Sequence, residues 1–268
     1  MTENRIAYLR PDQIRSRLSK LPLIILPLGP LEWHGPHLPY GTDPVNAECV
    51  AAELCRKVGG LLWPTLFWGT ERERSPQIAE NLGFRPDQFI VGMDFPKAGL
   101  PSSYCPEEVF GVVIRETLRE VRAIGGRIVV IINGHGGVNH IQVMDRLAKE
   151  YTATTDLRVR VRMAAPMKEV LAGSIGHATS DETSLMMALT RSVDLRTLPK
   201  GGRPLRYADF SIVDGPGFDG NGPADNTVPE SDDPRRTASP ARGNVLYKQT
   251  VNEIAREVRM LAKECGYA

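Results

Sequence analysis

The sequence has few of the features that characterise membrane proteins and nucleic-acid-binding proteins. Its longest nearly apolar run, residues 21–31, is about half as long as the roughly 20 residues that a bilayer-spanning helix needs. The 33 Lys and Arg residues nearly balance the 32 Asp and Glu residues, which leaves a net charge of +1 without any basic block. We therefore expect neither a nucleic-acid partner nor a membrane partner.

Cysteine is also scarce. Cys49, Cys55, Cys105 and Cys265 are scattered and lack the close pairing of a zinc ribbon or a redox dithiol, so we expect reduced, buried thiols. Residues 1–20 mix Arg, Asp and Glu and lack the apolar core of a secretory signal. The expected location is therefore the cytoplasm.

The remaining composition is that of an ordinary globular protein. The 268 residues are 41% hydrophobic and 24% charged, which suits one large domain or two small ones. No internal repeat, low-complexity tract or domain boundary is visible. We therefore expect a single domain over residues 1–268.

Short apolar runs alternate with helical patterns over the first two thirds of the chain. This alternation is typical of a parallel sheet built from strand, helix, strand units. The sequence therefore predicts an α/β fold with a mostly parallel central sheet flanked by helices. The expected strands are residues 22–28, 61–67, 127–132 and 157–163, and the expected helices are residues 46–58, 106–124, 139–151 and 245–264.

Residues 201–243 interrupt this pattern with seven Gly and six Pro, too many for regular elements. We expect a long surface connection there. Loops of that length are usually functional or form contacts between subunits, and flexible disorder is the alternative.

All five histidines lie in three segments, residues 32–43, 133–140 and 176–182. In the first segment an apolar strand runs directly into LEWHGPHLPYGTD, which places Glu32 and His34 beyond the carboxyl end of a strand. Open α/β sheets bind their ligands at that edge. If the chain is still extended, the spacing of two puts both side chains on one face.

Three further residues are able to join this pair. Asp43 follows eleven residues after Glu32, His135 stands at the end of the strand RIVVII in NGHGGVNH, and Glu182 lies near the start of an apolar helix in GHATSDETS. Taken singly, each has an ordinary structural explanation as a turn, loop or helix-terminal residue. Together they form a mixed nitrogen and oxygen ligand set suited to Zn²⁺, Mn²⁺ or Fe²⁺.

Two other motifs point away from alternative chemistries. NGHGGVN has the wrong glycine spacing for a dinucleotide fingerprint. PSSYCP contains Ser102, Ser103 and Cys105, but no G-x-S-x-G elbow surrounds a serine there. We interpret PSSYCP as a loop that faces the substrate.

Four blocks of the sequence resemble the signature blocks of the creatininase family, in that family's order. They are LPLGPLEWHGPHLPYGTD, INGHGGVN, GHATSDETS and DDPRRTASPARG, and the resemblance covers residues 22–264. It implies a compact α/β fold, a binuclear metal centre with two divalent ions per chain, and a ring-shaped homohexamer. It also implies a hydrolase that acts on a small-molecule substrate.

The resemblance assigns individual roles. Glu32, His34, Asp43 and His135 match the family's metal ligands, with Asp43 as the carboxylate that bridges both ions. His177 matches the residue credited with proton transfer. Creatininase itself has a Glu two residues after the histidine that matches His135, where this chain has Gly137. We therefore assign the missing carboxylate to Glu182.

The substrate is less closely defined. Trp33, which replaces the Gln of many relatives, would form an apolar or stacking wall or else pack in the core, and Ser102, Ser103 and Tyr104 would supply hydrogen bonds. We expect hydrolysis of a C–N bond in a small, cyclic amide. The alternatives are hydrolytic ring opening of an inositol-derived cyclic diketone and, from another class, a non-catalytic paralogue that binds a small ligand. His37 would orient the ligands or be purely structural.

Overall fold

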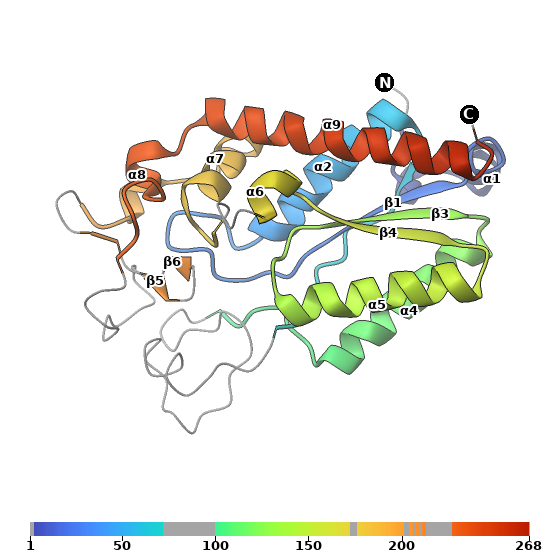
Figure 1. Ribbon diagram of the computed structural model, residues 1–268, viewed down its shortest axis with the longest axis horizontal. Coiled ribbons are helices and arrows are strands. Elements are labelled where there is room, and N and C mark those ends of the chain that lie inside the picture. Colours follow the sequence, from blue (N-terminus) through green and yellow to red (C-terminus); the bar gives the residue numbers. More distant parts are fainter. Residues whose placement is uncertain are drawn as a thin grey trace.

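The computed structural model describes residues 3–71, 100–171, 176–200, 204–205, 207–208, 211–212 and 227–267. Its centre is a sheet of four parallel strands in the order β2-β1-β3-β4 (Figure 1). β1 and β3 are paired over their whole length, from Leu23 opposite Ile128 to Leu28 opposite Asn133. The strands are β1 (Leu23–Leu28), β2 (Leu61–Leu62), β3 (Ile128–Asn133) and β4 (Arg158–Met163).

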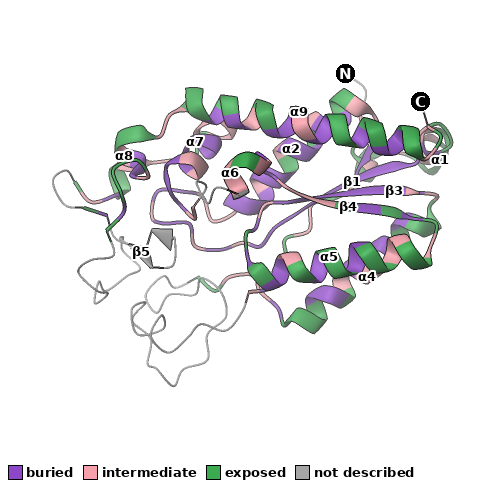
Figure 2. Ribbon diagram, viewed as in Figure 1, coloured by how far each residue is buried: buried purple, intermediate pink, exposed green. Residues whose placement is uncertain are grey.

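Helices cover both faces of this sheet (Figure 1). Because side chains alternate along a strand, Leu23 and Ile25 pack on one face and Ile24 and Leu26 on the other. The first face packs against α2 (Thr42–Val58) and α9 (Pro240–Glu264), and the second against α4 (Glu107–Ala123) and α5 (Val138–Thr154). The strands of β1 and β3 are buried on both sides, which explains their continuous apolar sequence (Figure 2).

The shorter elements lie around this framework. Within the described residues, no helix combines the length and the hydrophobicity that crossing a bilayer requires. The shorter helices are α1 (Pro11–Leu18), α6 (Met167–Leu171), α7 (Ser180–Leu189) and α8 (Pro234–Thr237), with 3-10 turns η1 (Ile6–Tyr8) and η2 (Leu195–Thr197) and a separate antiparallel pair of β5 (Tyr207–Ala208) and β6 (Ser211–Ile212).

The predicted α/β fold with a parallel sheet is confirmed. The predicted strand over residues 61–67 is wrong in its length, because β2 ends at Leu62. Pro64 has no N–H to donate. Beyond Leu62 the segment keeps separate backbone hydrogen bonds, from the Trp63 N–H to Ile25 at 2.9 Å, from the Leu66 N–H to Pro27 at 3.0 Å and from the Gly29 N–H to Leu66 at 3.1 Å. Regular pairing of the edge strand therefore ends after two residues, and isolated backbone hydrogen bonds hold the rest of the segment beside β1.

The C-terminal helix begins five residues earlier than predicted, at Pro240 in place of position 245. Ser239 caps this end, since its hydroxyl accepts a hydrogen bond from the Arg242 N–H at 3.2 Å. Proline at the first helical position lacks only an N–H that would have no intrahelical partner. A Cβ atom at Gly243 would lie 1.8 Å from the Ser184 carbonyl oxygen, so this glycine allows α9 to contact α7. Pro240 therefore begins the helix, and Gly243 lets it pack closely against α7, so neither residue interrupts it.

The prediction that residues 201–243 contain no regular element is also wrong in part. β5, β6, α8 and the first turn of α9 lie in this region. The Asp233 side chain accepts a hydrogen bond from the Arg235 N–H and caps α8. Residues 201–203, 206, 209–210 and 213–226 lie outside the described residues, so the rest of this expectation stays a prediction.

Candidate metal centre

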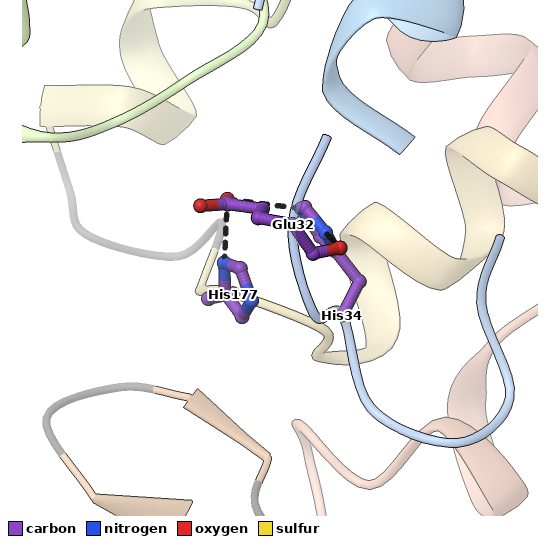
Figure 3. A group of neighbouring side chains, drawn as sticks. All are labelled: Glu32, His34 and His177. Carbon is purple, nitrogen blue, oxygen red and sulfur yellow. Dashed lines mark hydrogen bonds and ion pairs between the residues drawn. The ribbon is translucent and has the colours of Figure 1, made fainter. Parts of the chain in front are cut away.

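The candidate centre begins where β1 ends. After Leu28 the chain continues without regular structure, and Glu32 and His34 are both fully buried there. Their side chains converge, with 3.5 Å between His34 Nε2 and Glu32 Oε1 (Figure 3). The other ring nitrogen, Nδ1, lies 3.1 Å from the Glu32 carbonyl oxygen. Because a carbonyl can only accept, Nδ1 donates there, and Nε2 of the neutral ring keeps its lone pair for the centre.

Asp43 enters from the first turn of α2, which starts four residues before the predicted helix. The expectation that Asp43 precedes the helix is therefore wrong. Pro44 is accommodated because N–H groups in the first turn of a helix have no intrahelical acceptor, so the missing N–H breaks no hydrogen bond. Asp43 Oδ1 lies 3.1 Å from His34 Nε2. A Cβ atom at Gly134 would lie 2.2 Å from the Asp43 carbonyl oxygen, so only glycine lets the end of β3 pass this close to α2.

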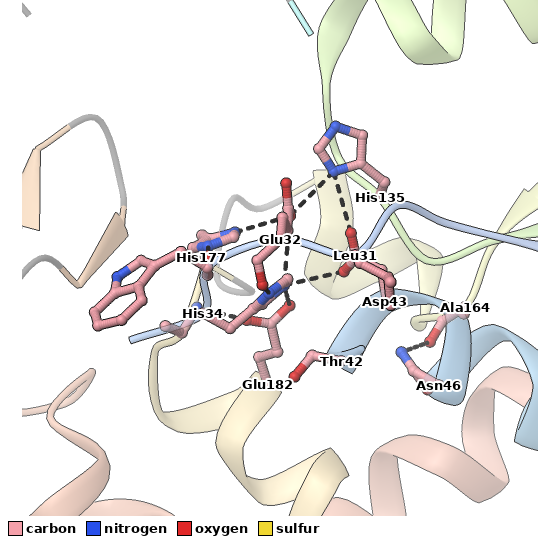
Figure 4. Close-up of polar contacts among 12 residues, drawn as sticks. Leu31, Glu32, His34, Thr42, Asp43, Asn46, His135, Ala164, His177 and Glu182 are labelled. Atoms are coloured by element: carbon pink, nitrogen blue, oxygen red, sulfur yellow. Dashed lines mark hydrogen bonds and ion pairs between the residues drawn. The ribbon is translucent and has the colours of Figure 1, made fainter. Parts of the chain in front are cut away.

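His135 approaches the carboxylates of Glu32 and Asp43 from the side opposite His34 (Figure 4). Its Nδ1 lies 3.2 Å from Glu32 Oε1 and 3.2 Å from Asp43 Oδ2. Glu32, Asp43 and His135 thus form a buried group whose donor atoms all lie within 4.8 Å of one another. The neighbouring strands β1 and β3 supply two of its three members, as the position at strand ends predicts.

A second group shares Asp43 with the first. It consists of His34, Asp43 and Glu182, again with donor atoms within 4.8 Å of one another. Glu182 lies in the first turn of α7, 3.7 Å from His34 Nε2, and accepts a hydrogen bond from the Ala178 N–H at 2.5 Å. Thr179 occupies the N-cap of α7 and makes no side-chain capping bond.

His177 lies beside this centre. Its Nδ1 is 3.5 Å from Glu32 Oε1, and its ring stacks on His34 with centroids 4.0 Å apart (Figure 3). Its Nε2 donates to the Trp33 carbonyl oxygen. The next residue, Ala178, has φ +61°. For a non-glycine residue this conformation costs on the order of 1 kcal/mol. The same turn therefore places His177 over the centre and directs the Ala178 N–H to Glu182.

The buried carboxylates differ in their pKa values. Burial raises the pKa of Glu32, and the Asp43 charge adds to that rise against the effect of the imidazoles. Burial also raises the pKa of Glu182, to about 7. At Asp43 burial acts in the same direction, but the facing His34 and His135 outweigh it and lower the pKa. Asp43 is therefore the carboxylate that stays ionised most readily.

The imidazoles respond in the opposite way. Burial alone would lower the pKa of His34, but Glu182 and Asp43 raise it to about 10. At His135, Glu32 and Asp43 likewise outweigh burial and raise the pKa well above its usual value. The pKa of His177 falls well below its usual value, since burial and the neighbouring His34 charge both disfavour its protonated form. The centre thus holds one imidazole that is neutral at physiological pH beside two that pair with carboxylates.

A further layer holds His135 in place, and the sequence did not single out its roles. Asn133 accepts from the His135 N–H at 2.9 Å and donates to the His135 carbonyl oxygen at 2.6 Å. His140 Nε2 lies 3.0 Å from the same Asn133 Oδ1, and its Nδ1 accepts from the Thr70 N–H at 3.4 Å. The Asn in the NGH sequence was the available signal, because an amide directly before a candidate ligand can bond both sides of its backbone.

The residues predicted to bind substrate have contacts within the chain. Ser103 Oγ accepts from the Leu31 N–H and donates to the Phe67 carbonyl oxygen, both at 2.7 Å. Tyr104 Oη donates to Glu32 Oε2, which brings the phenol to the candidate centre. Trp33 and Ser102 are partly buried, and none of their described contacts identifies a ligand, so their substrate roles stay predictions.

His37 is buried away from the donor groups. Its Nε2 lies 2.9 Å from the Thr183 hydroxyl, and the Asp194 N–H donates to its carbonyl oxygen at 3.0 Å. Burial lowers the pKa of His37 to about 4, and the His34 charge acts in the same direction. The ring therefore joins the loop after β1 to α7 as a neutral hydrogen-bonding group.

The comparison with known families agrees with this geometry. The model of the family described as Creatininase: Creatinine amidohydrolase matches residues 7–258. The chain belongs to the creatininase family. Its relatives include creatinine amidohydrolase of Pseudomonas putida, 25% identical over 255 residues that cover 88% of each chain. The amidohydrolase class that the family name carries is thereby supported.

A second relative is the mycofactocin precursor peptide peptidase of Mycobacterium ulcerans (strain Agy99), 27% identical over 192 residues, or 72% of this chain and 68% of the relative. Among solved structures, a crystal structure of creatinine amidohydrolase has a TM-score of 0.69 at 22% identity and covers 98% of both chains. A Zn-Zn form of a creatininase variant and a manganese creatininase each have a TM-score of 0.67. At such identities these structures establish the shared fold.

Proposed function

We propose that the chain is a metal-dependent hydrolase that cleaves a C–N bond of a small, cyclic amide at a centre for two divalent ions. One observation carries this proposal: two groups of metal-binding side chains share the single carboxylate of Asp43. The first group would use Glu32 and His135 with Asp43, and the second His34 and Glu182 with Asp43. A shared carboxylate holds two cations close together, as two-metal hydrolytic sites require.

The donor set fits such ions. Among the described residues, the ion pairs of Glu32, Asp43 and Glu182 are all with imidazoles, and none is with Lys or Arg. Several buried carboxylates without a permanent cation are unfavourable, and divalent ions would compensate them. Carboxylate oxygens and imidazole nitrogens without thiolates suit Zn²⁺, Mn²⁺ or Fe²⁺. The zinc and manganese forms of solved creatininases support the same choice.

The chain's own residues would divide the remaining work. When bound, two divalent ions would supply hydroxide at neutral pH by lowering the pKa of water, and they would polarise the carbonyl group of an amide. His177 has its Nε2 proton engaged by the Trp33 carbonyl oxygen, and its Nδ1 faces the centre. We assign to Nδ1 the transfer of a proton to the leaving nitrogen.

The relatives favour C–N bonds. One is named for hydrolysis of the cyclic amide creatinine and the other for a peptidase activity, so both names imply an amide bond. Ring opening of an inositol-derived diketone stays the second candidate. It would need hydrogen bonds from Ser102, Ser103 and Tyr104, and the Ser103 hydroxyl already bonds to backbone groups. A non-catalytic ligand-binding role is disfavoured, because all five proposed ligands converge. The proposed assembly is a homohexamer.

The deciding experiment is a substrate screen on metal-loaded protein of known metal content. Elemental analysis should find two divalent ions per chain, and cyclic amides and formamides should be hydrolysed with release of ammonia, an amine or a new carboxylate. Chelation should abolish turnover, and the added ion should restore it. Turnover of the inositol-derived ketones alone would replace the amide proposal with ring opening. Binding of these compounds without any turnover would favour the non-catalytic role.

A further inference from the structure

The two ring nitrogens of His135 face different surroundings. Nδ1 faces the candidate centre, 3.2 Å from both Glu32 Oε1 and Asp43 Oδ2. Nε2 points the other way and makes no hydrogen bond to the described residues, but it lies 3.6 Å from Glu71 Oε2, an ion-pair distance just beyond hydrogen-bond range. The His135 side chain is 5% exposed and that of Glu71 is 14% exposed, so neither group is freely hydrated. A nearly buried carboxylate thus faces the outer side of this imidazole.

Gly137 leaves the space for this contact. A Cβ atom built there would lie 2.5 Å from His135 Nε2 and 2.7 Å from Glu71 Oε2. Both distances are far below ordinary contact, so any side chain at position 137 would displace the imidazole, the carboxylate or both. The space beside His135 at position 137 is therefore open to Glu71, which comes from a segment far away in the sequence.

The residues before Glu71 are attached on two sides. The Gly69 N–H donates to the Ser103 carbonyl oxygen at 3.2 Å, and its own carbonyl oxygen accepts from the Cys105 N–H at 2.9 Å. The Thr70 N–H donates to His140 at 3.4 Å. The segment therefore reaches His135 through bonds to the loop before α4 and to a helix that carries a second buried histidine.

We propose that Glu71 is the positioning residue of His135: its carboxylate accepts the Nε2 proton and so keeps the Nδ1 lone pair directed into the centre. This inference rests on the proposed metal centre. Histidines that bind metals usually donate their other N–H to a carboxylate or a carbonyl group, which fixes the tautomer and increases the ligand's basicity. His34 has a backbone carbonyl oxygen in that role at 3.1 Å, and for His135 the Glu71 carboxylate, 3.6 Å from Nε2, would take it after a small approach. Glu71 itself belongs to neither group of donor atoms.

The experiment compares Glu71→Ala and Glu71→Gln with the wild type and with Glu116→Gln, an exposed glutamate on α4. Zinc affinity is measured by competition with a chromophoric chelator. We expect wild-type protein and Glu116→Gln to bind two ions, and Glu71→Ala to bind one of them about 10- to 100-fold more weakly, the usual effect of removing such a partner. Glu71→Gln should lie between them, because its amide oxygen still accepts the proton but carries no charge.

A second readout reports on the tautomer directly. In zinc-loaded protein with ¹⁵N-labelled histidine, we expect His135 to carry its proton on Nε2, and to lose this preference in Glu71→Ala. Gly137→Ala should weaken the same ion as Glu71→Ala, because its Cβ atom would occupy the contact. If Glu71→Ala fails to fold, judged by circular dichroism, the isosteric Glu71→Gln decides by the same two readouts.

The outcomes separate the two proposals. Two ions in the wild type with unchanged affinity and tautomer in both Glu71 variants would overturn the role of Glu71 and leave the metal centre intact. A wild-type chain that takes up no divalent ion would overturn the metal centre and the role of Glu71 with it.

Discussion

Two helices begin at the candidate centre, and each presents a carboxylate from its first turn to the same imidazole. Asp43 of α2 lies 3.1 Å from His34 Nε2, and Glu182 of α7 lies 3.7 Å from it. Asp43 has a second imidazole, His135, on its other oxygen, whereas the described ion pairs of Glu182 are limited to His34. The pKa of Asp43 is lowered, and that of Glu182 is raised to about 7.

This difference shows how position decides the role of a carboxylate. A helix N-terminus favours a negative charge in both cases, so it does not explain the contrast. The contrast comes from the neighbours: imidazoles on both oxygens keep Asp43 ionised, while burial dominates at Glu182. Under the proposed function, Asp43 would bind both ions and Glu182 only one of them.

Asp43→Ala should have the largest effect, because it removes the donor that both groups share. We expect loss of both divalent ions and of all turnover above background. Elemental analysis and an activity assay with a cyclic amide check this, with Glu53→Ala on the same helix as the control. Retention of one tightly bound ion would contradict the view that Asp43 bridges the two positions.

Glu182→Gln should remove less. We expect one ion to be lost and the other, held by Glu32, Asp43 and His135, to stay. The matched control is Asp181→Asn, since Asp181 lies in the same turn but binds Arg242 at 2.8 to 2.9 Å. Metal titration with two resolved steps in the control and one in Glu182→Gln would sharpen the comparison. Two unchanged steps would show that Glu182 is no ligand.

His177 forms a third group of possible donor atoms with Glu32 and His34, but this group lacks the shared carboxylate of Asp43. We therefore expect His177→Ala to leave both ions in place. Turnover should fall by roughly 10²-fold or more, the usual contribution of a positioned acid or base. The measurement pairs kcat with elemental analysis of the same preparation. A variant with full turnover, or one whose loss follows the loss of metal, would remove His177 from proton transfer.

The smallest effect concerns stability, at the contact between the loop after β1 and α7. The pKa of His37 is lowered from 6.5 to about 4, so the unfolded chain binds a proton there that the folded chain refuses. Stability is therefore lost as pH falls from about 6.5 toward 4. For metal-free protein, we expect His37 to account for about 2 kcal/mol of the loss between pH 7 and pH 5.

Urea unfolding at both pH values, for the wild type and His37→Gln, tests this contribution. The variant should be less stable at pH 7, because its bond to Thr183 is altered, but it should lose less on acidification. Equal losses in the two proteins would mean that His37 is protonated in the folded state.

Much of the fold and of the candidate centre followed from the sequence. The apolar strands predicted a parallel sheet because β1 and β3 are buried on both faces. Glu32 and His135 follow those two strands directly, and parallel neighbours end at one edge. The convergence of these residues was therefore predictable from local sequence. Asp43 and Glu182 were candidates by residue type alone, and no local pattern placed them against His34.

Other features depend on tertiary contacts that no local pattern reveals. Glu71 stands in the charged stretch TERER, which reads as an exposed loop, and its place beside His135 depends on the missing side chain at Gly137. The early start of α9 was hidden by Pro240 and Gly243, since both residues usually mark loops. In each case the structural role of the residue depends on the tertiary contacts around it.

The contact of Gly243 with Ser184 has a consequence for how the molecule tolerates sequence change. Even a methyl group there would meet the backbone of α7, and α7 carries Glu182 two residues before Ser184. Relief would require a shift of the helix that delivers this carboxylate. In a mutational scan, we therefore expect substitutions of Gly243 on α9 to be as damaging as substitutions of the proposed metal ligands. The position of the Glu182 carboxylate thus depends partly on Gly243, which has no chemical role of its own.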